Sequence, residues 1–397
     1  MMRIGVIGGG QLAWMMAGAA ESLGIELVVQ TPHPTDPAVA TATDSIFARI
    51  DDGAATAELA KRCDVITFEN EFINVSALIP LESQGVCFRP GLSALAPLLD
   101  KYHQRSYLQN LGLPVPSFFA IAQENTNSRI EDNSLRSSAL PLASSAVKIK
   151  NQNFPVVLKA RRHGYDGQGT FILKNREALE STLQQLGNTP VLLEEYIPFE
   201  KELAALAARS VTGEVVVYPV VETQQEQQVC RRVLVPADIP PAVEAEIQAL
   251  ARTLLDSLQA VGVFGIELFL TRTGKILVNE VSPRTHNSGH FTIDACYTSQ
   301  FEQHLRAVAG LPLGNPALRC GGAVMVNLLG YEDAEGNDYL GKRQQILKLP
   351  QSHVHWYGKT ASRPGRKLGH VTVLLESNQQ SEARDLAQKI ESIWYSE

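Results

Sequence analysis

Two glutamates on a predicted hairpin carry the most specific chemical signal in the sequence. The strands cover residues 264–270 and 275–281, and we expect a two-residue turn at Thr273 and Gly274 between them. In that register Glu267 lies directly opposite Glu280, at the ~4.5–5.5 Å spacing of cross-strand neighbours, where like charges repel. Oxygen-only ligands favour Mg²⁺ shared with nucleotide phosphates, and Mn²⁺ can replace it. The alternatives are one protonated carboxyl group or an arginine partner elsewhere in the chain.

A polar cluster follows the second strand of this hairpin. Residues 282–290 read Ser-Pro-Arg-Thr-His-Asn-Ser-Gly-His, so Arg284, His286 and Asn287 come just beyond Glu280. A fixed guanidinium there can hold a small planar anion beside a γ-phosphate. His286 can donate a hydrogen bond or move a proton. We expect His290 to be structural.

A glycine-rich loop over residues 164–169 lies between two predicted strands and follows Lys159, which ends an apolar strand. Glycine amides can close over phosphate oxygens, and the lysine supplies a positive charge for them. The alternative is a solvated hairpin turn, in which Tyr165 and Asp166 would be unusual choices.

The N-terminal strand ends in three glycines, Gly8 to Gly10, ahead of a predicted helix over residues 11–23. Backbone amides at such a helix start can bind a phosphate. A dinucleotide fingerprint also needs an acidic residue at the end of the second strand, and here residues 28–31 read Val-Val-Gln-Thr. The alternative is a tight strand-to-helix turn that binds no ligand.

Four cations lie within nine residues near the C-terminus of an otherwise acidic chain: Lys359, Arg363, Arg366 and Lys367. This cluster predicts a binding site for a substrate phosphate. The alternative is a solvated turn with surface charge.

The elements that must position these groups fall into three regions. A β–α–β start with further strands near 64–68 and 86–88 predicts a parallel α/β domain over residues 1–100. Residues 101–312 combine a helix near 101–111, strands at 156–159, 171–173 and 191–195, helices near 176–186 and 241–260, and the glutamate hairpin. Residues 313–397 are rich in strands, at 323–328, 354–357 and 370–375. Residues 123–153 are rich in Ser, Asn and Gln, which predicts an inserted surface loop.

Composition narrows the class of protein. The chain has 397 residues, 44% of them hydrophobic, which suits a globular protein of two or three domains. A net charge of −7 argues against nucleic-acid binding. Five scattered cysteines without a CxxC pair suggest reduced thiols. No apolar run reaches the ~18 residues of a membrane span, and the glycines interrupt the stretch that a signal peptide would need. We therefore expect a cytoplasmic protein that binds neither nucleic acid nor membrane.

In this order the motifs resemble the ATP-grasp superfamily and, within it, the N5-carboxyaminoimidazole ribonucleotide synthetase family. The most specific stretches are residues 164–167 (Gly-Tyr-Asp-Gly), 279–290 (Asn-Glu-Val followed by the polar cluster), 355–357 (His-Trp-Tyr) and 363–367 (Arg-Pro-Gly-Arg-Lys). The resemblance covers nearly the whole chain apart from residues 123–153 and the last twenty. It implies an ATP-grasp fold of mixed α/β and α+β class, with an N-terminal Rossmann-like (pre-ATP-grasp) domain and a small β-rich C-terminal domain.

The resemblance also implies an activity. Members of the family are ligases that couple ATP cleavage to bicarbonate and 5-aminoimidazole ribonucleotide. They form N5-carboxyaminoimidazole ribonucleotide, ADP and phosphate by way of carboxyphosphate, in de novo purine (IMP) biosynthesis. Magnesium ATP is the nucleotide substrate, and the members are commonly homodimers.

Residue roles follow from the same resemblance. The catalytic group would be Tyr165, Asp166, Arg284, His286 and Asn287, with Arg284 positioning bicarbonate and Asp166 orienting or deprotonating the amine. ATP would contact Lys101, Lys159, Gly164, Tyr165, Asp166, Gly167, Gln168, Gly169, Thr170, Glu194, Glu195, Tyr196, Ile197, Glu202, Gln225, Asn279 and Glu280. The ribonucleotide would contact Gly10, Gln11, Leu12, Glu71, Lys359, Arg366 and Lys367. Glu267 and Glu280 would hold the metal.

Two residues depart from the family pattern, because Gln225 stands where a histidine is usual and Gln168 where Arg or Lys is common. The competing functions are another ATP-grasp ligase using formate or an amino acid, a nucleotide-binding regulator that has lost catalysis, and a nicotinamide oxidoreductase. The 284–287 cluster and the basic C-terminal turn favour bicarbonate and a phosphorylated ribonucleotide. The missing acidic residue after the second strand disfavours nicotinamide binding.

Overall fold

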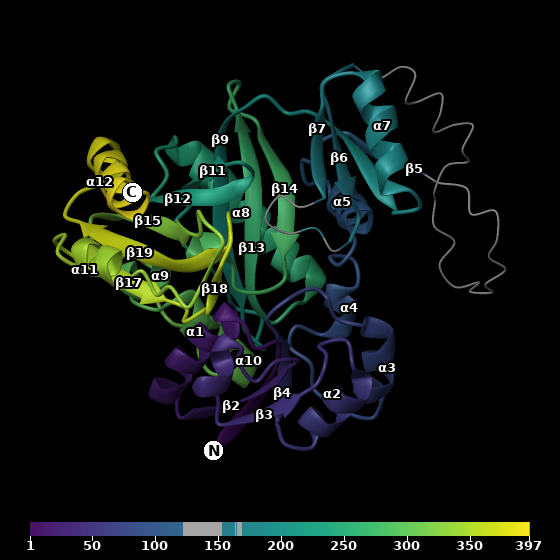
Figure 1. Ribbon diagram of the computed structural model, residues 1–397. Helices are drawn as coiled ribbons and strands as arrows, with labels where there is room; N and C mark the ends of the chain where they lie inside the picture. The colour runs from purple at the N-terminus through teal and green to yellow at the C-terminus, as the bar shows by residue number, and fades with distance from the viewer. Residues whose placement is uncertain (122–152, 163, 165–168, 397) are drawn as a thin grey trace.

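The computed structural model describes residues 1–121, 153–162, 164 and 169–396 (Figure 1). The predicted insertion at 123–153 lies outside these residues except for its last position. The same holds for Tyr165, Asp166, Gly167 and Gln168 of the glycine-rich loop.

The N-terminal part is a parallel four-stranded sheet in the order β3-β2-β1-β4, flanked by helices. Its strands are β1 (Met2–Ile7), β2 (Ile25–Thr31), β3 (Asp44–Phe47) and β4 (Val65–Phe68), and its helices are α1 (Gln11–Ala20), α2 (Gly53–Ala60), α3 (Val75–Ser83) and α4 (Leu92–Leu95). The strand expected at 86–88 is wrong, because Phe88 makes only a single bridge to Ile66. Pro90 follows closely and has no N–H with which to extend a ladder.

Glu69, at the carboxyl end of β4, explains the three glycines after β1. Its carboxylate accepts hydrogen bonds from the N–H groups of Gly10 (2.7 Å) and Leu12 (3.1 Å) at the start of α1. A Cβ atom on Gly10 would collide with this carboxylate, and one on Gly9 would lie 2.5 Å from Thr31 Oγ1. A dinucleotide phosphate would therefore find the N–H groups of this helix start already bound by the Glu69 side chain.

A second, antiparallel sheet follows in the order β5-β8-β6-β7. It consists of β5 (Phe118–Ile121), β6 (Val156–Ala160), β7 (Thr170–Leu173) and β8 (Val191–Glu195), with helices α5 (Lys101–Asn110) and α7 (Arg176–Leu186). This sheet carries Lys159 and the described ends of the glycine-rich loop, and it stands beside β14 at one edge of the molecule (Figure 1).

The largest sheet spans most of the remaining chain, in the order β14-β13-β9-β11-β12-β15-β19-β17, with β10 paired to β9. Its strands are β9 (Phe199–Arg209), β10 (Val215–Val217), β11 (Val221–Glu226), β12 (Val229–Val235), β13 (Gly262–Thr271), β14 (Ile276–Ser282), β15 (Gly322–Leu329), β17 (Ser352–Trp356) and β19 (Lys367–Leu375). Helix α8 (Pro241–Leu258) packs on β9 and β10. The sheet continues across residue 312 without a break, and the domain boundaries at 100 and 312 stay predictions.

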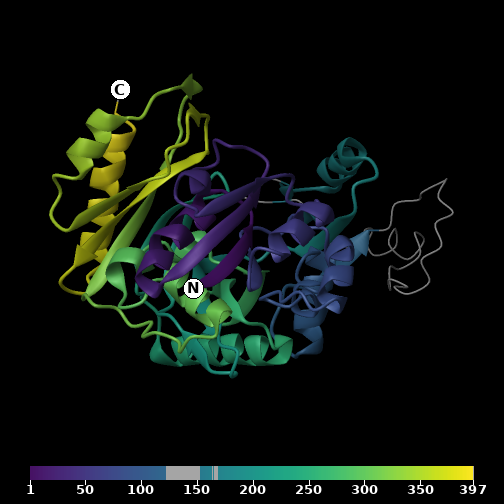
Figure 2. The same cartoon turned by 90° about the horizontal axis from the view of Figure 1, so that it is seen from below.

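Beyond its strands, the C-terminal part holds two helices that were not predicted, α11 (Leu340–Ile346) and α12 (Gln380–Trp394), and a small pair formed by β16 (Ala334–Glu335) and β18 (Ala361–Ser362). Helix α12 packs on β15 through Ala383, Ala387, Ile390 and Trp394, all fully or almost fully buried. Their spacing of three and four residues is the helical signal that the strand-rich interpretation passed over. Figure 2 shows this C-terminal layer and the β5–β8 sheet at opposite edges of the molecule, with the N-terminal sheet between them.

Helix α10 (Gln300–Ala309), preceded by α9 (Thr292–Ala295), joins the N-terminal part to the large sheet. It packs against α1, β9 and β13, and Phe301 and Leu305 enter the core around α1. Within it, His304 Nδ1 accepts from the Val263 N–H (3.1 Å), and Nε2 lies 2.8 Å from Thr67 Oγ1. Burial lowers the pKa of His304 to about 4.

No helix in the described part of the chain is both long enough and apolar enough to cross a membrane.

The contact between Gly10 and Glu69 gives a first prediction. Gly10→Ala should destabilise the fold by about 1–3 kcal/mol, because the new methyl group must displace the buried carboxylate. Gly18→Ala is the matched control on the same helix, where an added Cβ meets nothing within 4 Å. It should be neutral or stabilise by up to about 1 kcal/mol. Unfolding in urea measures both, and equal midpoints for the two variants would contradict the assignment.

His304 gives a second prediction. A histidine with a pKa of about 4 in the folded chain and ~6.5 in the unfolded chain gives its full stabilisation above pH ~6.5 and loses it as the pH falls toward 4. The difference corresponds to about 3 kcal/mol. His304→Gln should therefore lose less unfolding free energy than the wild type between pH 7 and pH 4.5. Parallel pH profiles for the two proteins would contradict this.

Candidate active site

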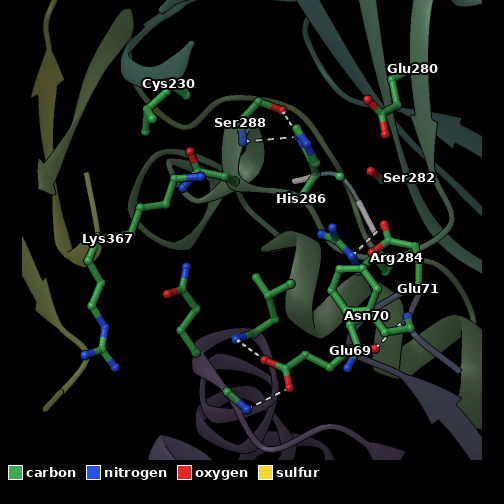
Figure 3. A pocket seen from close by; sticks show the side chains of 18 of the residues that line it. Glu69, Asn70, Glu71, Cys230, Glu280, Ser282, Arg284, His286, Ser288 and Lys367 are labelled. Carbon is green, nitrogen blue, oxygen red and sulfur yellow. Dashed lines mark hydrogen bonds and ion pairs between the residues drawn. The ribbon is translucent and has the colours of Figure 1, made fainter. Parts of the chain in front are cut away.

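A cavity of about 850 Å³ lies where the three parts of the chain meet, and Figure 3 shows it from close by. Both the N-terminal sheet and the large sheet contribute to its walls. The predicted site residues that line it are Gly10, Gln11, Leu12, Glu71, Lys101, Gly164, Thr170, Gln225, Glu267, Glu280, Arg284, His286, Asn287, Lys359, Arg366 and Lys367. Residues more than 300 positions apart in the sequence thus share one wall.

The other predicted residues divide into two groups. Lys159, Gly169, Glu194, Glu195, Tyr196, Ile197, Glu202 and Asn279 are described but do not line this cavity. Tyr165, Asp166, Gly167 and Gln168 lie outside the described residues.

Glu267 and Glu280 lie opposite each other in the hairpin, but the turn and the strand pairing that place them there differ from the prediction. The two-residue turn is wrong: Thr271 pairs with Lys275 around a three-residue loop that ends in Gly274, whose φ is +79°. That loop alone would shift the register by one residue. A β-bulge at Asn279 shifts it back, so that Glu267 and Glu280 are partners.

The bulge places Asn279 and Glu280 toward the same set of cations, although they are neighbours in the chain. Asn279 Oδ1 accepts from Lys159 Nζ at 3.0 Å, and Glu280 Oε1 pairs with Lys101 Nζ at 2.5 Å. A regular strand would turn two consecutive side chains to opposite faces. The bulge therefore gives one strand two polar groups on the same side of the site.

The two glutamates differ in charge state because their surroundings differ. Burial and the nearby negative charge of Glu280 raise the pKa of Glu267 to about 7. Burial opposes the ionisation of Glu280 as well, but the Lys101 ammonium outweighs it and lowers the pKa of Glu280. Both alternatives considered for this pair are thus partly realised: one carboxyl tends to keep its proton, and the other has a basic partner, which is a lysine.

A buried ion triad stands behind this pair. Glu194 lies between Arg105 Nε (2.5 Å) and Lys159 Nζ (2.7 Å), and all three side chains are almost fully buried. Burial disfavours the charged carboxylate, yet the two cations hold the pKa of Glu194 at about 2. The carboxylate of Glu194 is therefore bound by Arg105 and Lys159.

The three residues that follow Glu194 differ in their exposure to solvent. Glu195 is exposed and accepts from the Ser117 N–H at 3.1 Å, Tyr196 is exposed, and Ile197 is buried. Glu202 lies on β9, the strand next to β13, which carries Glu267. Burial and the charge of Glu267 raise the pKa of Glu202 to about 7. Glu202 and Glu267 are thus two acidic groups that a nearby cation would favour in their charged forms.

Arg284 and Glu71, which were predicted for different substrates, form an ion pair. Arg284 Nε lies 2.9 Å from Glu71 Oε1, and Nη1 donates to the Thr285 carbonyl at 2.9 Å. Figure 3 shows this pair at the side of the cavity that Glu280 also faces. The predicted anion-binding guanidinium is therefore held in place by a carboxylate from the N-terminal part.

The basic C-terminal turn reaches the N-terminal part from the other side. Lys359 Nζ donates to Gln11 Oε1 and to the Lys367 carbonyl, both at 2.7 Å. Arg366 Nη1 donates to the Ala361 carbonyl at 2.8 Å, and burial lowers the pKa of Arg366. Lysine, arginine and glutamine side chains thus converge on one wall of the cavity.

The carboxylate pair fits a magnesium ion in the chemistry of its donors. Both groups offer oxygen atoms only, and a divalent cation would favour the charged form of Glu267 that its neighbour disfavours. His286 Nε2 lies 3.4 Å from Glu267 Oε1. Among the described residues no cluster of three or more metal-ligating side chains is found, so phosphate and water oxygens would have to complete the coordination.

Sequence reasoning missed several residues that build this site. Arg105 anchors Glu194, and Glu69 anchors the start of α1. Gln300 and Asn327 hold the loop that carries His286 and Asn287. Glu69 had a usable signal, since it is the first polar residue after the buried strand β4. The other three are polar residues within helices or a strand, and their partners are distant in the sequence.

Three family models match the chain in succession. The ribonucleotide synthetase pre-ATP-grasp domain matches residues 1–97, the ATP-grasp domain matches residues 106–301, and the phosphoribosylaminoimidazole carboxylase C-terminal domain matches residues 323–384. Together they cover the three regions that the cavity joins.

Three similar proteins are named as N5-carboxyaminoimidazole synthases or synthetases, and other relatives are named phosphoribosylaminoimidazole carboxylase. An N5-carboxyaminoimidazole ribonucleotide synthase of Synechococcus elongatus is 52% identical, over 99% of this chain and 96% of its own length. A crystal structure of an N5-carboxyaminoimidazole ribonucleotide synthetase with ADP has 34% identity and a TM-score of 0.87, over 99% of this chain and 97% of that one. The synthase of Aspergillus clavatus, in complex with ADP and 5-aminoimidazole ribonucleotide, has 30% identity and a TM-score of 0.86, over 99% and 98%.

This likeness runs through the whole length of the chain and agrees with the fold and with the succession of domains. The chain therefore belongs to the N5-carboxyaminoimidazole ribonucleotide synthase family of ATP-grasp ligases.

Proposed function

We propose that this protein uses ATP to join bicarbonate to 5-aminoimidazole ribonucleotide, giving N5-carboxyaminoimidazole ribonucleotide, ADP and phosphate in purine biosynthesis. One observation carries the proposal. A single cavity is lined by the carboxylate pair, by the Arg284 loop and by the basic C-terminal turn, so it offers a place for a metal-bound phosphate, a small anion and a phosphorylated substrate together. The relative crystallised with ADP and 5-aminoimidazole ribonucleotide supports both ligands.

The nucleotide would bind between the β5–β8 sheet and the hairpin. Lys101, on α5, and Lys159, on β6, both come from the side of this sheet, and each already faces an oxygen of the hairpin, on Glu280 and on Asn279. Gly164, at the start of the glycine-rich loop, and Thr170, directly after the loop, line the cavity. We assign the adenine to the strand end at Glu194–Ile197 and the ribose to Glu202, with Gln225 at the edge.

Glu267 and Glu280 would hold Mg²⁺, which neutralises phosphate charge when bound. In the chain itself, Lys101 pairs with Glu280 and reduces the repulsion between these carboxylates. A bound cation would favour the charged form of Glu267.

The Arg284 loop would supply the carboxylation step. Arg284 holds bicarbonate, one of whose oxygens attacks the γ-phosphorus of ATP, forming carboxyphosphate as the bond to ADP breaks. The exocyclic amine of the ribonucleotide then attacks the carbon, either of carboxyphosphate or of the CO₂ that it releases. Phosphate departs, and the amine loses a proton to a base, for which Asp166 is our candidate. Carboxyphosphate decomposes in water, so this chemistry requires that the cavity exclude solvent.

The ribonucleotide would lie between the N-terminal part and the basic turn. Lys359, Arg366 and Lys367 would bind its 5′-phosphate, while Gln11 and Glu71 would meet the ribose and the aminoimidazole. The hydrogen bond from Lys359 to Gln11 joins the basic turn to the N-terminal part before the substrate binds. A homodimer, as in the family, stays a prediction.

Replacement of Glu280 tests the metal assignment. Glu280→Gln should lower the rate of ADP release by about 100-fold or more, because it removes one charged oxygen ligand of the phosphate-bound ion. The fold should persist, as judged by thermal unfolding. Glu302→Gln, which breaks an ion pair with Arg306 on α10 at residues that do not line the cavity, is the control. Wild-type ADP release from the Glu280 variant would refute the assignment.

Replacement of Arg366 tests the phosphate site. Arg366→Ala should raise the KM for 5-aminoimidazole ribonucleotide by about 10-fold or more and leave the KM for ATP within about twofold, because a charge-assisted contact to phosphate is lost. Lys348→Ala, at an exposed lysine of the same C-terminal part, should change neither constant. Equal effects on both substrates in the Arg366 variant would contradict the assignment.

A further inference from the structure

The loop after β14 has little regular structure, although it carries Arg284, His286 and Asn287. Only a short 3₁₀ turn, Asn287–Gly289, follows β14 before α9 begins. The N–H and C=O groups of such a buried loop must find partners outside a helix or sheet ladder. Gln300 supplies such partners to His286, and Asn327 binds the side chain of Asn287.

Gln300, the first residue of α10, binds the backbone of His286 on both sides. The His286 N–H donates to Gln300 Oε1 at 2.8 Å, and Gln300 Nε2 donates to the His286 carbonyl at 2.8 Å. Nε2 also lies 3.1 Å from His290 Nδ1. Gln300 is fully buried. Its carboxamide therefore acts toward His286 as a neighbouring strand would, and it fixes the peptide plane on each side of this residue.

Asn327, on β15, binds the side chain of the next residue. Asn287 Nδ2 donates to Asn327 Oδ1 at 3.0 Å, and Asn327 Nδ2 donates back to Asn287 Oδ1 at 2.8 Å. The same nitrogen of Asn327 also donates to the Cys230 carbonyl at 2.9 Å, on a strand that lines the cavity. Asn327 is fully buried. Asn287 was predicted to be catalytic, and here its carboxamide is engaged by the C-terminal part.

A third contact fixes the ring of His286. Its Cβ packs against β13 at Gly265, where an added Cβ would lie only 2.5 Å away. Nδ1 of His286 lies 2.8 Å from Ser288 Oγ and 3.4 Å from the Ser288 nitrogen. Nε2, on the other side of the ring, lies 3.4 Å from Glu267 Oε1. A change in the backbone of His286 would move the ring relative to Glu267.

We propose that Gln300 and Asn327 are positioning residues of the carboxylation step. Gln300 sets the backbone of His286, and Asn327 sets the side chain of Asn287, so that the loop presents Arg284 and His286 to the bicarbonate in one fixed arrangement. Both act through other residues and touch no reacting atom. The inference rests on the proposed function, because it needs bicarbonate at this loop.

The chain contains a natural control for this clamp. Gln303, three residues along the same helix, is also fully buried. Its carboxamide accepts from the Gly314 N–H at 2.7 Å and donates to the Gly314 carbonyl at 2.9 Å. The chemistry matches that of Gln300, yet Gly314 does not line the cavity. Loss of Gln303 should thus measure what such a clamp contributes to stability alone.

The test compares Gln300→Met with Gln303→Met in the full-length protein. Both variants should lose similar thermal stability, because each removes a carboxamide that pairs with both the N–H and the C=O of one residue. Only Gln300→Met should lower kcat for ADP release with 5-aminoimidazole ribonucleotide, by about 10- to 100-fold, and raise the KM for bicarbonate, with the KM for ATP unchanged. Asn327→Leu should show the same split between bicarbonate and ATP, and it tests the second clamp if Gln300→Met does not fold.

The outcomes distinguish a failure of the proposed function from a failure of the positioning role. If the wild type releases no ADP in response to bicarbonate and the ribonucleotide, the proposed function fails. If the wild type is active but Gln300→Met and Asn327→Leu keep the wild-type kcat and bicarbonate KM, the positioning role is refuted. The role is also refuted if Gln303→Met impairs catalysis as much as Gln300→Met, since the effect would then be one of general stability.

Discussion

The repulsion between Glu267 and Glu280 is the constraint around which this site is built. Two carboxylates at partner positions of a hairpin, in a half-buried setting, need either a proton or a cation. The protein provides both in part: the pKa of Glu267 rises to about 7, while Lys101 pairs with Glu280. Lys101 lies on α5 and Lys159 on β6, so these charges link the part of the chain that contains the β5–β8 sheet to the hairpin. Glu194 and Arg105 extend that balance into the core behind it.

Much of the support for the site comes from helix α10, none of whose residues lines the cavity. Helix α10 contributes Phe301 to the N-terminal core, His304 to the junction of β4 and β13, and Gln300 to the loop beyond β14. Glu69 fills the start of α1, and Glu71, two residues later, holds Arg284. The Rossmann-like part thus has the glycine-rich turn of a nucleotide-binding fold, but the Glu69 side chain binds the N–H groups that would otherwise bind an anion.

Local patterns in the sequence were enough to predict β1, α1, β2 and β4, the strands β6 to β8 with α5, α7 and α8, and the facing of the two glutamates, but they missed β9 to β12 and α10. They could not give the path of the hairpin, because the bulge at Asn279 depends on contacts with Lys159 that lie 120 residues away. The ATP-grasp fold and the family assignment are confirmed. The helix α12 was overlooked although its buried residues recur at helical spacing. The partners of Glu194, Asn287 and Arg284 could not be foreseen, since each comes from another element and polar pairs of this kind leave no periodic trace.

The uninterrupted large sheet has a mechanical consequence. The carboxylates on β13 and β14 and the cation Lys367 at the start of β19 belong to one hydrogen-bonded ladder, so their separation is set by the backbone spacing of the intervening strands. Such a sheet resists in-plane deformation, so it holds the carboxylates on β13 and β14 at a fixed distance from Lys367. Any adjustment to substrates of different size would then have to come from the smaller sheet and from the N-terminal part, which lie outside this hydrogen-bonded ladder.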